Sequence, residues 1–387
     1  MSLLNDRLTP LLRHFTETGP AGCALQVAQR GRTLYEGYAG LACLEEQRPI
    51  GPDTIYRIYS MSKIVTCTAA LMLYERGLFA LNDPLDEYMP EFHDPQVCRM
   101  DRLGSLSVDK AAGPIRIRHL FTMTSGYPYP GEGTETGRMM AKIAGEAEAK
   151  DPVRKWTLDD LMRLLSTLPL AFDPGTHWLY GMSHDILGAL IERLTGKRLG
   201  EFMRDEIFGP LDMADTSFRI SPEKRQRLCS LYNRAEDGTL SRNTAMDGDF
   251  EPDAVFESGG GGLLSTLHDY GRFAQALASG ELDGVRLLSP NTLRLMMMNQ
   301  LEAGPLADYC GGHMAGYGYG LGVYVLTDPA ACGGNANAGE FGWSGMAGTL
   351  VFMDPKEQLS AVYMQQMMPT RETYHLPRLR NGIYGAL

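Results

Sequence analysis

Several residue types are scarce in this sequence, and each scarcity excludes a class of protein. Only seven of the 387 residues are cysteine, and they form neither a CxxC pair nor another metal-ligand spacing. An odd and scattered set of this kind predicts a reducing compartment rather than a framework of disulfides. The most apolar stretch, residues 64–74, is too short to span the roughly 30 Å hydrocarbon core of a membrane.

The start of the chain lacks a basic segment followed by an apolar one, so no secretory signal is expected. The sequence therefore predicts a cytoplasmic protein without a membrane partner, and a secreted form that has been trimmed fits the same residues.

Positive charge is also scarce, with 36 lysines and arginines against 47 acidic residues and a formal net charge of −11. Nucleic acid is therefore not expected as a partner, because phosphate-binding surfaces need clustered basic side chains. The eight histidines show no HExxH or paired spacing, and the glycine run at 259–262 matches no phosphate loop. We expect no metal and no cofactor. The GxSxG motif is absent too, which argues against an α/β-hydrolase esterase.

What is present is the composition of a globular protein, with 44% hydrophobic and 21% charged residues. Two β-prone runs around a turn predict a hairpin within residues 22–40, and residues 94–113, rich in Pro, Asp and Ser, are expected to be loop. Helical periodicity predicts helices over residues 5–18, 60–76, 117–124, 157–168, 185–194 and 268–277. Strands are predicted over residues 319–326, 349–353 and 359–364.

The first candidate for chemistry is Ser60-Met61-Ser62-Lys63, which opens a predicted helix that is apolar on nearly every face. Residues three apart share a helix face, so Lys63 can point its amine at Ser60 Oγ. A serine hydroxyl needs such a base nearby, and burial lowers the pKa of a lysine toward neutrality. The same spacing recurs at 107–110 and 221–224, but neither begins a long apolar helix. A helix cap with a solvated lysine is the alternative interpretation.

Two later segments supply further candidates. Tyr180 follows a Pro-Gly turn and precedes a predicted helix with Ser183 at its N-cap, so its phenol can relay a proton or merely pack. The small residues of Gly342-Trp343-Ser344-Gly345-Met346 let a backbone N–H approach a substrate carbonyl, although a simple strand-end turn fits as well.

In this order, Ser60-x-x-Lys63, Tyr180 and Trp343-Ser344-Gly345 resemble the motifs of class C β-lactamases, DD-peptidases and family VIII carboxylesterases. Flanking segments match as well, so the resemblance extends from about residue 22 to residue 364. It implies an α/β (α+β) fold of the β-lactamase/transpeptidase type, with an antiparallel sheet flanked by helices. The sheet domain would comprise residues 1–85 and 255–387, a mostly helical domain residues 86–254, and the site would lie between them.

The resemblance also implies roles for individual residues. Ser60 is the expected nucleophile, and Lys63 and Tyr180 share the acid and base work. The expected oxyanion hole is formed by the backbone N–H groups of Ser60 and Met346. How Lys63 and Tyr180 divide the proton transfer stays open, because interacting groups titrate as a unit.

Two departures from the family pattern bear on the substrate. Met182 stands where β-lactamases and DD-peptidases usually have Asn, and Trp343 stands where they usually have Lys. Both changes remove polar recognition of a penicillin-like or D-Ala-D-Ala ligand, and a Trp here is typical of family VIII esterases. Uncharged esters are therefore favoured, because an unpaired carboxylate is costly to desolvate.

The expected substrate-binding residues share nearness to these motifs: Trp343, Ser344, Gly345, Met182 and Tyr127. With Met61 and Met346 beside the motifs and Tyr129 near Tyr127, an apolar acyl or alcohol pocket is expected. His184 follows Tyr180 closely enough to reach the site, but a surface position at a helix start is expected.

The sequence thus predicts a serine hydrolase that forms an acyl-enzyme with small carboxylic esters, its partner being a small-molecule ester or amide. No oligomeric state is predicted. A β-lactamase or DD-peptidase, an acyltransferase and a catalytically silent protein that keeps the fold stay open as alternatives.

Overall fold

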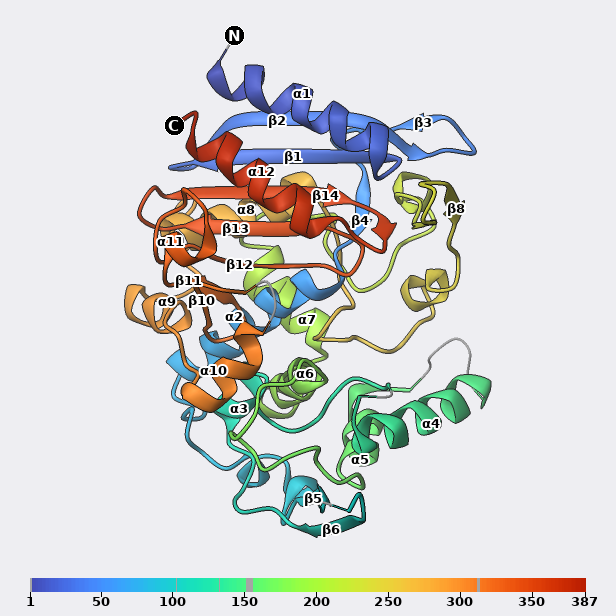
Figure 1. The fold of residues 1–387 in the computed structure, drawn as a ribbon, viewed down its shortest axis with the longest axis vertical. Coiled ribbons are helices and arrows are strands. Elements are labelled where there is room, and N and C mark those ends of the chain that lie inside the picture. The colour runs from blue at the N-terminus through green and yellow to red at the C-terminus, as the bar shows by residue number, and fades with distance from the viewer. Residues whose placement is uncertain (1, 102, 132, 151–155, 312–313) are drawn as a thin grey trace.

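An eight-stranded antiparallel sheet, in the order β10-β11-β12-β13-β14-β1-β2-β3, organises the fold. The computed structural model describes residues 2–101, 103–131, 133–150, 156–311 and 314–387. The strands of this sheet are β1 (Gly22–Gln29), β2 (Arg32–Cys43), β3 (Arg48–Pro49), β10 (Tyr317–Tyr319), β11 (Tyr324–Leu326), β12 (Phe341–Ser344), β13 (Leu350–Asp354) and β14 (Leu359–Gln365). Because β1 pairs with β14, from Cys23 opposite Gln365 to Gln29 opposite Leu359, the two ends of the chain build one sheet (Figure 1).

Helices cover both faces of this sheet (Figure 1). On one face, α1 (Leu3–Thr18) packs against β2 and against α12 (Glu372–Tyr384), and on the other α8 (Leu267–Ser279) packs against β14 and β1. The buried residues of α1 recur at helical spacing and form one apolar stripe: Leu4, Leu8, Leu12 and Phe15. The predicted antiparallel sheet flanked by helices is confirmed.

The helix that carries the SxxK motif lies at the centre of the molecule. After β4 (Ile55–Arg57) and a 3-10 turn (Tyr59–Met61), α2 (Ser62–Glu75) is buried at all but its last few positions. It packs against α6 (Ser183–Thr195) and α7 (Leu199–Met203), which come from the middle of the chain. A helix apolar on nearly all faces needs neighbours on all sides, and the middle segment supplies them.

The middle of the chain combines helices with small sheets. Its other helices are α3 (Ile117–Phe121), α4 (Glu135–Lys150) and α5 (Leu158–Leu165), and its strands are β5 (Gln96–Met100), β6 (Leu106–Lys110), β7 (Tyr232–Arg234) and β8 (Leu240–Arg242). The later part of the chain adds β9 (Leu264–Thr266), α9 (Pro290–Met296), α10 (Ala303–Cys310), α11 (Pro329–Cys332) and β15 (Met367–Met368). Strand β9 pairs with β4, and β15 pairs with β7.

Two expectations for local structure were wrong. Residues 94–113 were expected to be loop but contain the hairpin β5–β6, in which Val97 is buried and all of β6 is exposed. With one buried position, the hairpin has no apolar alternation for a sequence pattern to detect. The strand expected over 319–326 is split into β10 and β11 by a turn, in which Gly322 has a φ of +85°.

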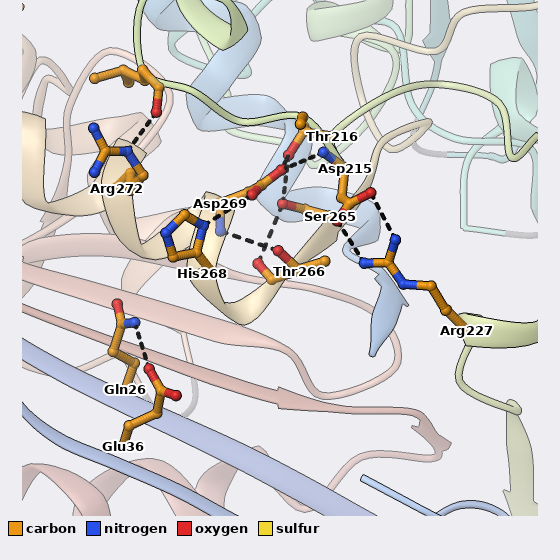
Figure 2. A network of polar contacts seen from close by, with 12 residues as sticks. Gln26, Glu36, Asp215, Thr216, Arg227, Ser265, Thr266, His268, Asp269 and Arg272 are labelled. Carbon is orange, nitrogen blue, oxygen red and sulfur yellow. Dashed lines mark hydrogen bonds and ion pairs between the residues drawn. The ribbon is translucent and has the colours of Figure 1, made fainter. Parts of the chain in front are cut away.

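A polar network ties the middle segment to the start of α8 (Figure 2). The buried carboxylate of Asp269 accepts the N–H of Asp215 at 2.7 Å and the hydroxyl of Thr216 at 3.0 Å. The side chain of Asp215 in turn binds Arg227 through two contacts of 3.0 and 2.5 Å. A carboxylate that satisfies several donors from another segment fixes the position of that segment relative to the sheet.

None of the described helices is both long and apolar enough to cross a membrane.

Candidate active site

A cavity of about 970 Å³ opens beside Ser60, where the sheet meets the helices of the middle segment. Ser60 belongs to the 3-10 turn that precedes α2. The residue before it, Tyr59, has a φ of +42°, in the left-handed region that few non-glycine residues adopt. Such a backbone costs roughly 1–3 kcal/mol and is typical of functional turns.

Lys63 makes three hydrogen bonds to residues that line this cavity. Its Nζ lies 3.2 Å from Ser60 Oγ, 2.9 Å from the hydroxyl of Tyr129 and 2.5 Å from the carbonyl oxygen of Gly260. The side chain is fully buried. An ammonium group has three N–H bonds, so three acceptors satisfy its charged form.

The charge on Lys63 differs from the sequence-based expectation. Burial lowers the pKa of Lys63, but the phenol groups of Tyr129 and Tyr180 outweigh this effect and raise the pKa above its usual range. Lys63 therefore stays an ammonium ion at neutral pH, whereas burial was expected to bring its pKa toward neutrality. The expectation was wrong because burial was considered without the acceptors that surround the amine.

Tyr180 lies against this ammonium group and is held by aromatic neighbours. The centre of its ring is 4.7 Å from Lys63 Nζ. Its hydroxyl oxygen accepts the indole N–H of Trp343 at 3.1 Å, and its ring stacks on Trp178 at 6.2 Å between centres. The structure thus brings Ser60, Lys63 and Tyr180 together, as the motifs predicted.

Tyr129 and Asp185 also reach the site. Burial raises the pKa of Tyr129 to about 12 although Lys63 lowers it, so its phenol keeps its proton at neutral pH. Asp185 is buried, and its Oδ1 accepts the Ser258 hydroxyl at 2.6 Å and the N–H of Gly260 at 3.2 Å. Burial raises the pKa of Asp185, while Ser258 and Lys63 act in the opposite direction.

Tyr129 was expected near the apolar pocket together with Tyr127 but was given no part in the chemistry, and Asp185 was given no role. Tyr129 is 66 positions from Lys63 and Asp185 is 75 positions from Gly260, so spacing gives no signal. The segment 185–188 was part of the family resemblance, and this was the one sign that could have drawn attention to Asp185.

The two expected oxyanion donors lie on neighbouring segments of the cavity wall. Among the described residues, neither the N–H of Ser60 nor that of Met346 has a protein acceptor. A Cβ on Gly345 would lie 2.4 Å from the carbonyl oxygen of Ile58, so only glycine lets the end of β12 come this close to the nucleophile turn. The N–H of Gly345 also donates to the Thr349 carbonyl at 2.7 Å, which fixes the turn that presents Met346.

Of the other residues expected to bind substrate, four line the cavity and one does not. Met182, Trp343, Ser344 and Gly345 line the cavity with Ser60. Tyr127 does not line this cavity: it is buried, with its ring 5.9 Å from that of Phe92, so the expectation that it binds substrate was wrong.

Two expectations at the start of α6 were also wrong, and so was one about Met61. His184 is buried rather than exposed, because this end of α6 packs under α2, and its Nε2 lies 3.3 Å from the carbonyl oxygen of Phe121. Ser183 was expected to be the N-cap of this helix, but it is the first helical residue and Met182 is the N-cap. Met61 was expected beside an apolar pocket, but its side chain lies in the apolar core.

The other two SxxK segments are not placed for catalysis. Residues 107–110 lie on the exposed strand β6, and residues 221–224 lie in a turn before a 3-10 helix. Within the described part of the chain, no three His, Cys, Asp or Glu side chains are grouped as metal ligands.

Comparisons with known proteins identify the family and the fold of this chain. The family model described as Beta-lactamase matches residues 8–382. Protein Rv1367c of Mycobacterium tuberculosis (strain ATCC 25618 / H37Rv) is 32% identical over 365 residues, covering 90% of this chain and 86% of that protein. Esterase EstB of Burkholderia gladioli is 31% identical over 360 residues, covering 89% of this chain and 85% of that protein. The solved structure of EstCE1, described as a hydrolase with promiscuous acyltransferase activity, has a TM-score of 0.82 at 23% identity and covers 99% of both chains.

Proposed function

The chain belongs to the beta-lactamase family of serine hydrolases, and from this membership we propose that it hydrolyses small, uncharged carboxylic esters through an acyl-enzyme at Ser60. One observation carries the choice of substrate. The described residues that line the cavity include four carboxylates, Asp185, Asp249, Asp308 and Glu372, but no lysine or arginine. The Lys63 ammonium group beside Ser60 is already bound by three acceptors, so a substrate carboxylate, which penicillins and D-Ala-D-Ala peptides carry, would stay unpaired.

In the acylation step, Ser60 Oγ forms a bond to the ester carbonyl carbon and loses its proton. Lys63 already donates three hydrogen bonds as an ammonium ion and cannot take this proton. The proposed acceptor is the Tyr180 oxygen, because the nearby ammonium group and the Trp343 N–H stabilise negative charge on it. The backbone N–H groups of Ser60 and Met346 bind the oxyanion as it forms.

Tyr180 then returns the proton to the leaving alcohol as the bond between the carbonyl carbon and the alcohol oxygen breaks. In deacylation, water attacks the acyl carbonyl and gives a proton to Tyr180. The tetrahedral intermediate collapses, the carboxylic acid leaves, and Ser60 Oγ takes the proton back. Lys63 holds Ser60 Oγ in place throughout. The division of labour that the sequence left open is thus proposed as Tyr180 for proton transfer and Lys63 for orientation and charge.

The test compares hydrolysis of p-nitrophenyl butyrate with that of the cephalosporin nitrocefin. We expect rapid ester turnover, little nitrocefin cleavage, and loss of both in Ser60→Ala by at least a thousandfold. The matched control is Ser107→Ala, in the exposed SxxK segment of β6, which should turn over the ester like the parent protein. Preference for nitrocefin would favour a β-lactamase or DD-peptidase, and ester hydrolysis surviving in Ser60→Ala would refute the mechanism.

Acyl transfer to an alcohol is a second candidate, since EstCE1 is described as having that activity and an apolar cavity beside the acyl group can hold an alcohol. With p-nitrophenyl butyrate and added 1-butanol, the ratio of butyl butyrate to butyric acid separates the two reactions. We expect the acid to predominate. Acylation of Ser60 without release of either product, seen by intact-mass spectrometry, would indicate a catalytically silent protein.

A further inference from the structure

We propose that the part of the cavity between α4 and α5 binds the acyl chain of the substrate, so that the preferred esters carry medium-length rather than short apolar acyl groups. This inference rests on the proposed ester hydrolysis. The region, called here the leucine lobe, is lined by apolar side chains from α4, α5 and two flanking segments: Met140, Leu161, Leu164, Leu168, Trp156 and Phe256.

The spacing of residues on α5 explains why this lobe is apolar. Leu161, Leu164 and Leu165 recur at three- and four-residue intervals and so lie on one face of α5, and Leu168 follows the end of the helix. The opposite face carries Arg163, whose guanidinium pairs with Asp159 at 2.6 Å on the surface. The helix therefore presents a leucine stripe to the cavity and its charges to solvent.

The far wall of the lobe is aromatic. The rings of Trp156 and Phe256 stack with 4.4 Å between their centres and 22° between their planes. Leu164, Leu168 and Trp156 all remain partly exposed although they lie among buried residues. Partly exposed apolar groups that enclose a cavity favour an apolar ligand, because such a ligand removes their surface from water.

The acyl and alcohol parts of an ester lie on opposite sides of its reacting carbonyl, and the site distinguishes these sides. The leaving alcohol must lie at Tyr180, which returns a proton to it. That side is walled by Trp178 and Trp343. Leu161 of the leucine lobe belongs to the core cluster against which Met182 packs, Trp178 and Tyr180 pack against a different cluster, and Trp343 packs against both. The acyl chain therefore points toward the leucine lobe.

Two substrate series test this assignment. One varies the acyl chain with p-nitrophenol as leaving group, from acetate through butyrate and octanoate to dodecanoate. The other varies the alcohol of acetate esters, from ethyl to octyl. A buried methylene is worth up to about fourfold in binding, so we expect kcat/KM for the octanoate to exceed that for the butyrate by at least tenfold. Equal kcat/KM across the acyl series would overturn the proposal.

A variant that fills the lobe sharpens the test. Leu164→Trp should lower kcat/KM for the octanoate by at least tenfold, lower that for the butyrate by less than threefold, and leave the alcohol series unchanged. The control, Arg163→Trp, adds the same side chain to the solvent face of α5 and should leave both series unchanged. If Leu164→Trp changes the alcohol series instead, the lobe holds the alcohol and the acyl assignment is wrong.

A binding measurement separates failure of this inference from failure of the proposed function. Ser60→Ala should bind methyl octanoate at least tenfold more tightly than methyl butyrate in calorimetry, and adding Leu164→Trp should abolish the difference. If Ser60→Ala shows this difference while the parent hydrolyses no ester, the lobe stands and the proposed reaction fails. If Leu164→Trp does not fold, Trp156→Ala replaces it, and the enlarged lobe should shift the preference from octanoate toward dodecanoate. No preference for octanoate in either measurement would refute the lobe.

Discussion

Lys63 and Asp185 bind the two backbone groups of one residue, Gly260. Lys63 Nζ donates to its carbonyl oxygen, and Asp185 Oδ1 accepts its N–H at 3.2 Å. A buried cation and a buried carboxylate are thereby held close to each other beside the nucleophile without direct contact. The carboxylate compensates the charge of the ammonium ion, which would otherwise be costly to bury.

Gly260→Ala should disable this arrangement. A Cβ at this position would lie 2.6 Å from Asp185 Oδ2 and 3.0 Å from the Tyr129 hydroxyl, so one of these groups must move. We expect kcat/KM for p-nitrophenyl butyrate to fall at least a hundredfold. Gly261→Ala is the matched control, because its Cβ would have 3.8 Å to the nearest atom, and it should cost no more than threefold. Equal losses in the two variants would contradict the role of Gly260.

Asp185→Asn should reduce activity and change its pH dependence. The amide oxygen can still accept from Ser258 and Gly260, but the negative charge is lost. Without that charge the ammonium form of Lys63 is less stable, so the pKa of Lys63 falls and the ammonium ion is lost at a lower pH. We expect kcat/KM to fall at least tenfold and the alkaline limb of its pH profile to move to lower pH.

The control for this profile is Ser258→Ala, which removes the 2.6 Å hydrogen bond to Asp185 but keeps the charge. It should leave the alkaline limb in place. An unmoved alkaline limb in Asp185→Asn would show that Asp185 does not compensate the charge of Lys63.

Trp343→Phe tests the hydrogen bond to Tyr180. The phenyl ring keeps the apolar wall, while the N–H that donates to the Tyr180 oxygen at 3.1 Å is lost. Because this donor stabilises negative charge on the oxygen during proton transfer, we expect kcat to fall about tenfold with little change in KM. A rise in KM at constant kcat would assign Trp343 to substrate binding alone. Steady-state kinetics over a range of p-nitrophenyl butyrate concentrations separates these outcomes.

His184 should limit stability in acid. Burial lowers its pKa to about 3, against roughly 6.5 in an unfolded chain. Between these two pKa values the unfolded state binds a proton at His184 that the folded state does not. The stability that neutral, buried His184 contributes to the folded state is therefore complete above about pH 6.5 and is lost as the pH falls toward 3. Between pH 7 and pH 5, this one group lowers the free energy of unfolding by about 2 kcal/mol.

In His184→Gln, the fall in the free energy of unfolding between pH 7 and pH 5 should be smaller than in the parent by about 2 kcal/mol, whatever the stability of the variant at pH 7. Urea unfolding at pH 7 and pH 5, for the parent and the variant, measures the difference. A loss of the same size in both proteins would show that protonation of His184 does not govern acid stability.

The sequence predicted those parts of the site that depend on local geometry. Three-residue spacing on a helix placed Lys63 beside Ser60, and the family resemblance, carried by small residues just before a predicted strand, implied that Met346 reaches the site. It did not predict the contacts between distant segments. The Asp185–Gly260 contact and the bond from Trp343 to Tyr180 join elements that meet only in the folded chain.

Errors in the predicted fold have a related cause. His184 was expected to be exposed because polar residues begin α6, but α2 packs over that helix end, and a pattern within one helix cannot report its neighbour. The hairpin β5–β6 went undetected because exposed strands need no apolar alternation.

The pairing of β1 with β14 has a consequence for synthesis. A ribosome releases β1 early, and its partner emerges only when most of the remaining chain has been made. The nascent protein therefore carries an open strand edge, without Trp343 to complete the pocket, for most of its translation time. During that interval, pairing of this edge with another chain competes with folding. Demand for chaperones should thus be greatest before β14 appears, and the hydrolase becomes active only after that strand has been made.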